Sequence, residues 1–272
     1  MPSFNRRKLT KWLKLAVIIY VLLGLLLYFF QEKFLFHPTV LKADHKFTFN
    51  QPFEEITIPV SPEKDISIIR FTVPDSVCRG VVLYLHGNRR NVERYAPFAQ
   101  FFTRNHYEVW MPDYPGFGKT TGSRSEKAFN TDATEVYKMI KARFAPEQII
   151  IYGKSLGTGP ATYLASRVDC ARLILETPYT SIPDLFGYYA FIYPTSRMSN
   201  YQFPSIDRME TVKAPVSIFH GTRDGVIPYK QAVRLQRKAG DKAQLITIEG
   251  GGHNNLADYP LYQSSLDSLL NH

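Results

Sequence analysis

The chain is poor in cysteine and shows no cluster of metal ligands. Cys78 and Cys170 are the only cysteines among 272 residues, too few for a disulfide framework or a four-ligand zinc site. No group of histidines and carboxylates suggests another metal, and no G-x-G-x-x-G follows an expected strand. We therefore expect no metal and no cofactor. With 16 Gly, 18 Pro and 44% hydrophobic residues, the composition also excludes collagen-like and disordered chains.

Acidic residues are missing from the first fourteen positions, which hold five lysines and arginines. The formal net charge of the chain is +9, so the remaining 258 residues carry only +4. More than half of the excess positive charge therefore belongs to one end of the chain. We therefore expect no nucleic-acid partner.

A long run without charge follows this basic end. Residues 15–30 read LAVIIYVLLGLLLYFF, which corresponds to about 24 Å of helix and approaches the roughly 30 Å core of a bilayer. A cleaved signal peptide is the main alternative, but small residues should then follow the run, and the bulky YFFQEKFLF follows instead. A buried core helix is the other alternative. We expect an uncleaved, single-pass membrane anchor.

The basic flank predicts the orientation of this anchor. An N-terminus rich in lysine and arginine favours the cytoplasmic side, which places the rest of the chain on the extracytoplasmic side, the periplasm in a Gram-negative cell. The expected organisation is a cytoplasmic tail at 1–14, an anchor at 15–30, a juxtamembrane connector at 31–52 and one folded domain at 53–272.

The folded domain alternates apolar runs with helical patterns, which predicts an α/β fold with a mostly parallel, doubly wound sheet. Nearly continuous apolar runs, typical of buried parallel strands, occur at 81–85, 107–111, 149–152, 172–176, 216–219 and 245–248. More polar runs at 56–60 and 66–73 suggest strands at an edge. Helical spacing is found at 91–104, 125–144, 157–168, 229–238 and 256–270.

A candidate nucleophile lies where such a sheet binds its ligands, beyond the carboxyl end of a strand. Residues 153–157 read GKSLG and fit G-x-S-x-G between a strand and a helix, the arrangement that exposes a serine hydroxyl on a sharp turn. Ser155 is the predicted nucleophile. The alternative is a Gly-Ser turn without chemistry.

A serine nucleophile needs a base and an acid. His253 follows a late strand in a glycine-rich loop, and Asp224 follows the strand before it, within HGTRDGVIP. The order Ser155, Asp224, His253 is that of the α/β-hydrolase fold. Asp258 and Asp113 are rival candidates for the acid.

Several spaced motifs carry a resemblance to a known family. They are LHGN at 85–88, DYPGFGKTTG at 113–122, YGKSLGTG at 152–159, ETPYTS at 176–181, HGTRDGVIP at 220–228 and GGGH at 250–253. From about residue 54 to 270 the chain resembles an α/β-hydrolase of the serine type, most similar to the membrane-anchored Bem46-like and serine aminopeptidase-like hydrolases. The resemblance implies an α/β-hydrolase fold with a short cap insertion at about 178–213. It also implies that the backbone N–H groups of Leu156 and Asn88 form an oxyanion hole.

The expected cap is rich in aromatic residues. Eight of the 25 residues from Tyr179 to Phe203 are aromatic, about a third, whereas aromatic residues make up 14% of the whole chain. An aromatic cap could line a pocket for an acyl group, pack on the body of the domain, or touch the bilayer. The possible substrate-binding residues are Lys154, Tyr179, Phe186, Tyr188 and Tyr189; the Lys154 side chain could equally point away or form a salt bridge.

The predicted function is that of a membrane-anchored serine hydrolase. It would cleave carboxylic esters or thioesters of a small-molecule or lipid-like acyl substrate through an acyl-enzyme. An amidase or peptidase with the same three residues is the first alternative. A non-catalytic binding protein on a hydrolase scaffold is the second.

Overall fold

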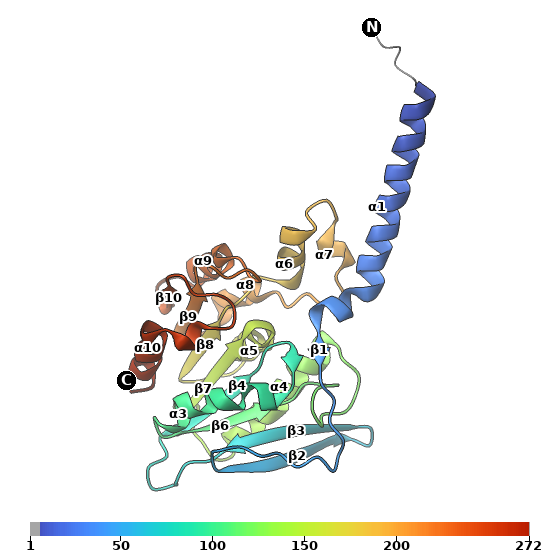
Figure 1. The fold of residues 1–272 in the computed structure, drawn as a ribbon. Helices are drawn as coiled ribbons and strands as arrows, with labels where there is room; N and C mark the ends of the chain where they lie inside the picture. Colours follow the sequence, from blue (N-terminus) through green and yellow to red (C-terminus); the bar gives the residue numbers. More distant parts are fainter. Residues whose placement is uncertain (1–5, 272) are drawn as a thin grey trace.

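A computed structural model describes residues 6–271 of the chain (Figure 1). The strands are β1 (His37–Pro38), β2 (Phe53–Ser61), β3 (Lys64–Phe71), β4 (Gly80–Leu85), β5 (Arg89–Arg90), β6 (Tyr107–Pro112), β7 (Ile149–Lys154), β8 (Arg172–Glu176), β9 (Val216–Gly221) and β10 (Ala243–Ile248). The α-helices are α1 (Arg6–Leu35), α2 (Val92–Tyr95), α3 (Gln100–Thr103), α4 (Glu126–Lys141), α5 (Thr158–Ala165), α6 (Ile182–Tyr189), α7 (Thr195–Met198), α8 (Ser205–Arg208), α9 (Tyr229–Ala239) and α10 (Pro260–Asn271). Short 3₁₀ helices are η1 (Ala96–Ala99), η2 (Pro146–Gln148), η3 (Ser155–Gly157), η4 (Met209–Thr211), η5 (Gly240–Lys242) and η6 (Leu256–Asp258).

Eight strands form one sheet in the order β10-β9-β8-β7-β4-β6-β3-β2. The six from β10 to β6 are parallel, while β3 pairs antiparallel with both β6 and β2 at one edge. This arrangement confirms the expected fold class, including the position of the two polar strands at an edge. The strand order places the carboxyl ends of β7, β9 and β10 at one rim of the sheet.

The alternation of side chains along β4 shows why the central strands are apolar throughout. Val81, Leu83 and Leu85 belong to the core on one face, and Val82 and Tyr84 belong to the core on the other. Helices α4, α5 and α9 contribute to the first core, and α2, α3 and α10 contribute to the second. A strand covered by helices on both faces needs apolar side chains at every position.

Two expected helices are interrupted in the structure. The helical pattern at 91–104 forms α2, η1 and α3, with Pro97 near the start of η1. A proline supplies no N–H and does not sustain the α-helical hydrogen-bond ladder. The pattern at 256–270 forms η6 and then α10, which begins at Pro260. These breaks leave the strand topology unchanged.

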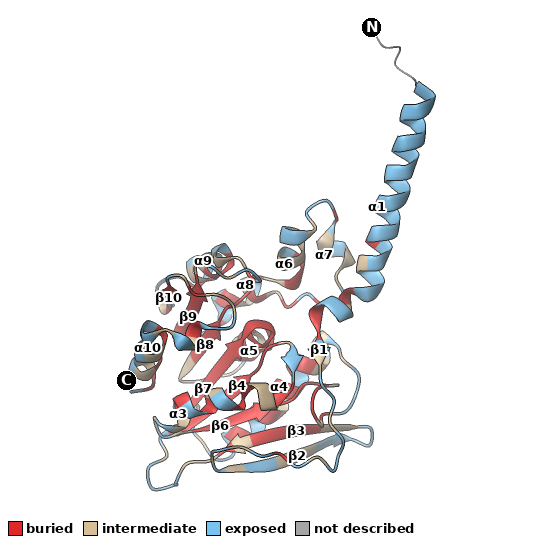
Figure 2. Cartoon of the chain, viewed as in Figure 1, coloured by how far each residue is buried: buried red, intermediate tan, exposed pale blue. Residues whose placement is uncertain are grey.

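Helix α1 extends away from the body of the domain (Figure 1). It is long and apolar enough to cross a membrane, and nearly all of its side chains are exposed (Figure 2). The helix continues through Leu35, into the segment expected as a connector. Directly after it, Phe36 is buried against Phe117, Phe129 and Tyr201. The helix is therefore joined to the core of the domain without an intervening flexible stretch.

Residues between β8 and β9 contain helices α6, α7 and α8. Helices α6 and α7 lie beside the lower part of α1 rather than over the middle of the sheet (Figure 1). This segment corresponds to the expected cap at about 178–213. Helix α6 begins after Ser181, whose hydroxyl accepts a hydrogen bond from the backbone N–H of Asp184, and carries Pro183 in its first turn, a combination that favours a helix start.

Candidate active site

Ser155 stands on the sharp turn between β7 and α5. Its φ angle is +50°, a left-handed conformation that costs free energy for a residue with a side chain and is found where the surrounding structure enforces it. The turn directs the hydroxyl towards the rim of the sheet at the start of a helix, where free backbone N–H groups gather. Ser155 itself is only 9% exposed, and it lines a pocket at the end of this buried turn.

The glycines on either side make the turn possible because other backbone segments pass against them. A Cβ on Gly153 would lie 2.6 Å from the carbonyl oxygen of Gly157, and a Cβ on Gly157 would overlap the carbonyl oxygens of Leu85 and His86. The contacts of Gly157 are with the backbone of β4 and its following loop, and that of Gly153 is with the backbone of the turn itself, so side-chain rotation cannot relieve either. The spacing of the glycines therefore follows from steric exclusion.

Replacing Gly157 by alanine is expected to destabilise the protein by about 3 kcal/mol, the upper end of the usual cost of overpacking. The new methyl group would force the turn away from β4. Urea unfolding of the purified full-length chain measures the change. Gly225→Ala is the matched control, since no atom lies within 4 Å of the position a Cβ would take there. Equal midpoints for the two variants would contradict this account of the turn.

His253 lies between Ser155 and Asp224. Its Nε2 is 2.9 Å from the Ser155 Oγ, and its Nδ1 is 2.8 Å from the Asp224 Oδ2. The residue comes from the loop after β10, and Asp224 comes from the loop after β9. With Nδ1 protonated, the imidazole donates a hydrogen bond to the carboxylate through Nδ1 and accepts one from the serine hydroxyl through Nε2. The structure thus brings the three predicted residues into one hydrogen-bonded row.

Asp224 is held as a carboxylate by several donors. Its Oδ1 accepts from the backbone N–H groups of Val226 and Ile227, each at 2.8 Å. The buried His220 approaches Oδ2 at 3.4 Å and places its Nε2 2.9 Å from the Ile227 carbonyl oxygen. Burial raises the pKa of Asp224, but the hydrogen bonds from His220 and His253 outweigh it and hold the pKa well below the usual range.

This lowered pKa predicts how stability depends on pH. A carboxyl group with a depressed folded-state pKa stabilises the fold above its unfolded pKa of about 3.9, and the contribution is lost as the pH falls towards the folded-state pKa. We expect the stability difference between the wild type and Asp224→Asn to be complete above about pH 5 and to shrink below pH ~4. Urea midpoints across this range measure it. A difference that grew on acidification would contradict the assignment.

The rival acids lie elsewhere. Asp113 pairs with the buried His86, whose Nε2 is 3.0 Å from its Oδ1, and the same oxygen accepts from the Val92 N–H at 2.9 Å. Asp258 ends η6. The carboxylate against His253 is that of Asp224.

Leu156 and Asn88 line the same pocket as Ser155 and His253, a cavity of about 170 Å³. Leu156 follows Ser155 in the first turn of the helix, where a backbone N–H has no acceptor within the helix. The side chain of Asn88 donates to the Leu35 carbonyl oxygen at 2.7 Å, and the backbone carbonyl of Asn88 accepts from the His37 N–H at 2.9 Å. Neither contact uses the backbone N–H of Asn88, and both bond the residue to the end of α1 or the segment directly after it.

The possible substrate-binding residues occupy different places. Lys154 is 4% exposed and its ammonium pairs with the carboxylate of Glu176. Tyr179 is buried, and its hydroxyl donates to the Leu156 carbonyl oxygen at 3.0 Å. Both line the pocket at Ser155. Burial raises the pKa of Tyr179 well above the usual value, so its hydroxyl remains a donor.

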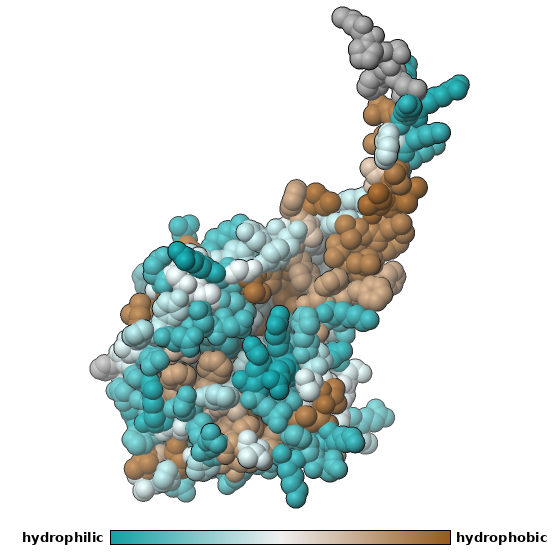
Figure 3. Space-filling view, viewed as in Figure 1, coloured by the Kyte–Doolittle hydropathy of each residue, from teal (hydrophilic) through white to brown (hydrophobic). Residues whose placement is uncertain are grey.

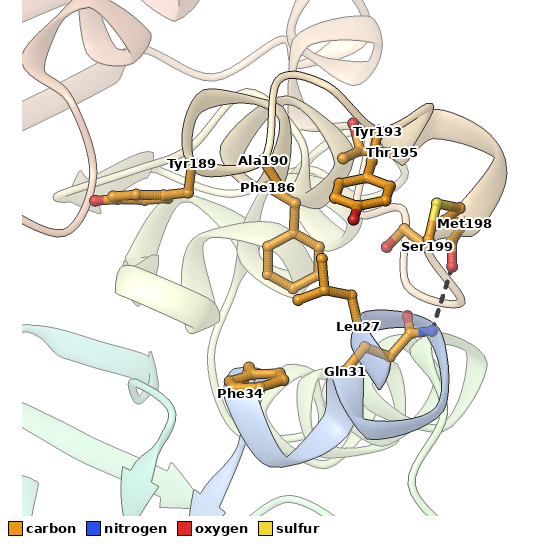
Figure 4. Close-up of a pocket in the computed structure, with 10 residues that line it drawn as sticks. All are labelled: Leu27, Gln31, Phe34, Phe186, Tyr189, Ala190, Tyr193, Thr195, Met198 and Ser199. Atoms are coloured by element: carbon orange, nitrogen blue, oxygen red, sulfur yellow. Dashed lines mark hydrogen bonds between the residues drawn. The ribbon is translucent and has the colours of Figure 1, made fainter. Parts of the chain in front are cut away.

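The other three lie on α6. Phe186 and Tyr189 line a second cavity of about 290 Å³, which separates α6 and α7 from α1 (Figure 4). The Tyr189 hydroxyl donates to the carbonyl oxygens of Gly225 and Val226, in the loop that carries Asp224. Tyr188 is 51% exposed and contacts Lys230. Tyr188 is in the lining of neither cavity.

Sequence reasoning missed several residues at this site. His220 was assigned no role at the site, yet it stands four positions before Asp224 and is buried against it. Phe34 was placed in a connector, but it lines both cavities. The position of His220 within HGTRDG could have indicated its role. No local pattern could have shown that Phe34 approaches Ser155.

Comparison with known proteins gives the family context. Residues 76–206 match the family described as serine aminopeptidase, S33. The chain is 33% identical over 202 residues to the α/β hydrolase domain-containing protein 17C of Xenopus tropicalis, covering 71% of this chain and 62% of the relative. The human protein of that name is 32% identical over 202 residues, with coverages of 71% and 59%. The chain thus spans less than two thirds of the length of these relatives.

Solved structures show the same fold. The Pyrococcus furiosus esterase Pf2001 superposes with a TM-score of 0.68 at 17% identity, covering 87% of this chain and 97% of the esterase. An α/β hydrolase from a Medee basin deep-sea metagenome, MGS-M2, superposes with a TM-score of 0.64 at 15% identity, with coverages of 80% and 98%. Together with the sheet topology and the turn at Ser155, these likenesses show that the chain has the α/β-hydrolase fold.

Proposed function

We propose that the protein is a serine hydrolase that transfers an acyl group to Ser155 and then to water. The observation that carries the proposal is the position of the His253 imidazole, within hydrogen-bond distance of both the Ser155 hydroxyl and the Asp224 carboxylate. Three side chains from separate loops meet in this order at the rim where the fold binds its ligands. A base between an alcohol and an acid is the arrangement that activates a serine.

The first half of the reaction forms the acyl-enzyme. His253 Nε2 accepts the proton of the Ser155 hydroxyl as Oγ bonds to the carbonyl carbon of the substrate. The carbonyl oxygen becomes an oxyanion, which the N–H groups of Leu156 and Asn88 stabilise. The imidazolium, stabilised by Asp224, returns the proton to the departing alcohol or thiol as the bond to the carbonyl carbon breaks.

The second half consumes water. His253 takes a proton from a water molecule, whose oxygen attacks the acyl carbon. The second oxyanion collapses, the bond to Oγ breaks, and the proton returns to Ser155. One water is consumed, and one acid and one alcohol or thiol are produced. No oxidant or reductant is needed.

Esters and thioesters are favoured over amino-terminal peptides by the charges of the pocket. An aminopeptidase must hold a free ammonium group close to the scissile bond, and a carboxylate is the usual partner for one. Among the residues described, the lining of the pocket includes Arg89, Lys154 and two histidines but neither aspartate nor glutamate. An amidase or peptidase acting away from a free amino terminus is the second candidate, supported by the match to the serine aminopeptidase family.

The chain is also proposed to be anchored in a membrane by α1. The uncharged run lies within a helix whose exposed face is apolar, and water would be an unfavourable solvent for it. The basic residues before the run favour a cytoplasmic N-terminus and an extracytoplasmic catalytic domain. Alkaline phosphatase fused to the C-terminus tests this orientation, and an inactive fusion would argue against it.

Activity-based labelling tests the proposed chemistry. A fluorophosphonate should label the full-length protein in detergent, and Ser155→Ala should abolish the signal. Ser123→Ala, at an exposed position, serves as the control and should label like the wild type. A paired screen of esters, thioesters and amides then ranks the leaving groups. Labelling that persists in Ser155→Ala would refute the nucleophile, and an unlabelled wild type would favour a non-catalytic binding protein.

A further inference from the structure

The cap is bound to the anchor helix at a point far along its apolar run. The rings of Tyr20 and Tyr193 stack with centroids 4.6 Å apart. The Tyr193 hydroxyl donates to the Tyr20 carbonyl oxygen at 2.9 Å, and the Tyr20 hydroxyl donates to the Ile192 carbonyl oxygen at 3.1 Å. Gly24 allows this approach, since a Cβ there would lie 3.0 Å from the Tyr193 ring. The loop between α6 and α7 therefore lies against the middle of α1.

A second set of contacts fastens the cap near the end of α1. Gln31 donates to the Met198 carbonyl oxygen at 3.2 Å and accepts from the Asn200 N–H at 2.7 Å. The Tyr201 hydroxyl donates to the Glu32 carboxylate at 2.8 Å. The cap thus touches the helix at two levels, around Tyr20 and around Gln31.

If α1 crosses a bilayer, the contacts around Tyr20 must lie within that bilayer. Tyr20 precedes Glu32, the first charged residue after the run, by twelve positions, which is about 18 Å of helix. The loop beside Tyr20 ends in large apolar side chains that nothing in the described structure covers: Phe191 is 82% exposed and Ile192 is 55% exposed. Figure 3 shows apolar surface continuing from α1 onto the neighbouring cap. This loop has the surface expected for contact with acyl chains.

A cavity of about 290 Å³ lies at the level of Gln31, where Leu27, Gln31 and Phe34 of α1 line it. Leu27, Phe34 and Phe186 converge on it, with Tyr193 and Met198 on the side of the cap (Figure 4). The polar side chains at its wall have partners elsewhere: those of Gln31, Thr195 and Ser199 bond to carbonyl oxygens of Met198, Pro183 and Tyr201 respectively. The cavity therefore offers apolar contact and few free hydrogen-bonding groups.

The cavity adjoins the pocket of Ser155. Phe34, at the end of α1, lines both. On α6, Leu185 lines the pocket of Ser155 while its neighbour Phe186 lines the cavity. Apolar side chains thus continue from the surface that faces the bilayer to the nucleophile.

We propose that this cavity binds the acyl chain of an ester lipid that enters sideways from the bilayer, between α1 and the cap, and places its ester carbonyl at Ser155. This rests on the proposed function and names its substrate class. The membrane segment then serves as one wall of the substrate site. In this arrangement Phe34, which lines both cavities, lies where the acyl chain of the lipid meets its ester group. The absence of a carboxylate from the described lining of the Ser155 pocket suits the phosphate of a lipid headgroup.

The first test measures chain-length preference. The full-length protein is reconstituted in phosphatidylcholine vesicles, and the rate with p-nitrophenyl palmitate is divided by the rate with p-nitrophenyl acetate. Leu27→Trp and Ala190→Trp fill the cavity from its two walls and are expected to lower this ratio about tenfold or more. Leu25→Trp, on an exposed part of α1 outside the cavity lining, should keep the wild-type ratio. Equal ratios in all four proteins would overturn the proposal.

The second test does not depend on catalysis. Ser155→Ala protein is irradiated in vesicles that contain phosphatidylcholine with a diazirine on its acyl chain, and adducts are mapped by mass spectrometry. Adducts at Leu27, Phe186 or Met198 support the proposal even if the wild type proves inactive, a result that would remove only the proposed function. Adducts confined to residues 15–26 would overturn it. Hydrolysis of an S-palmitoylated peptide but not of the lipid would also overturn it, in favour of an acylated protein.

Discussion

His253→Ala is expected to lower kcat for ester hydrolysis by about 10⁴–10⁶-fold, because members of a catalytic triad act as one unit. The imidazole is the only group described between the Ser155 hydroxyl and the Asp224 carboxylate. Its removal leaves a hydroxyl with no acceptor for its proton. Initial rates with a soluble p-nitrophenyl ester measure the loss, and the residual rate reports the oxyanion donors.

The control for this variant is another histidine that is paired with a carboxylate. His45 lies 2.9 Å from Glu93 and is outside the lining of the Ser155 pocket. His45→Ala should retain activity within about twofold, as expected for a surface pair of small energetic weight. A His253→Ala protein with a rate within tenfold of the wild type would exclude this residue as the base.

Glu176→Ala is expected to lower the free energy of unfolding by about 3–5 kcal/mol, the usual result of removing one partner from a buried ion pair. Glu176 is fully buried and pairs with Lys154, while the hydroxyls of Tyr152 and Tyr262 donate to its other oxygen. Burial, together with the charge of Glu176, raises the pKa of both tyrosines well above the usual value, so they remain donors. Alanine would leave a buried ammonium without its carboxylate, and the two hydroxyls with only each other as partners, at 2.9 Å. Urea unfolding measures the change.

Two further variants separate the effect of the charge from that of size. The double variant Lys154→Met with Glu176→Gln removes the charges, keeps an acceptor for the tyrosines, and should recover much of the lost stability. Glu135→Ala removes a partly exposed carboxylate that pairs with the exposed Lys138 on α4 and should cost less than about 0.5 kcal/mol. If the double variant were no more stable than Glu176→Ala, the ion pair would not be the cause.

The sheet was predictable because its physical signal is local. Strands buried on both faces must be apolar at each position, so β4, β7 and β9 could be identified from the sequence. The candidate active site could also be predicted, since parallel strands bring their carboxyl ends to one rim of the sheet. Ser155 and His253, 98 positions apart, could therefore be expected to meet there.

The remaining features depend on tertiary contacts that no short pattern encodes. In the sequence, Glu176 is simply an acidic residue at the end of a strand. Only the structure shows that it is buried and neutralises Lys154. The segment after residue 30 has no clear period, so its continuation in α1 and the short pairing of β1 with β5 could not be anticipated. Aromatic residues in the cap suggested an apolar pocket. They gave no indication that α1 would form one of its walls.

The unbroken passage from α1 into the domain has a kinetic consequence. Asn88 is bonded to Leu35 and His37. If α1 spans a bilayer as proposed, these contacts hold the pocket of Ser155 at a fixed distance from the lipid surface. A domain on a long flexible tether would sample solution, whereas a domain held in this way would meet substrates that diffuse in two dimensions. Its turnover should then follow the mole fraction of substrate in the leaflet, and dilution with inert lipid should slow it even when the amount of substrate per volume stays constant.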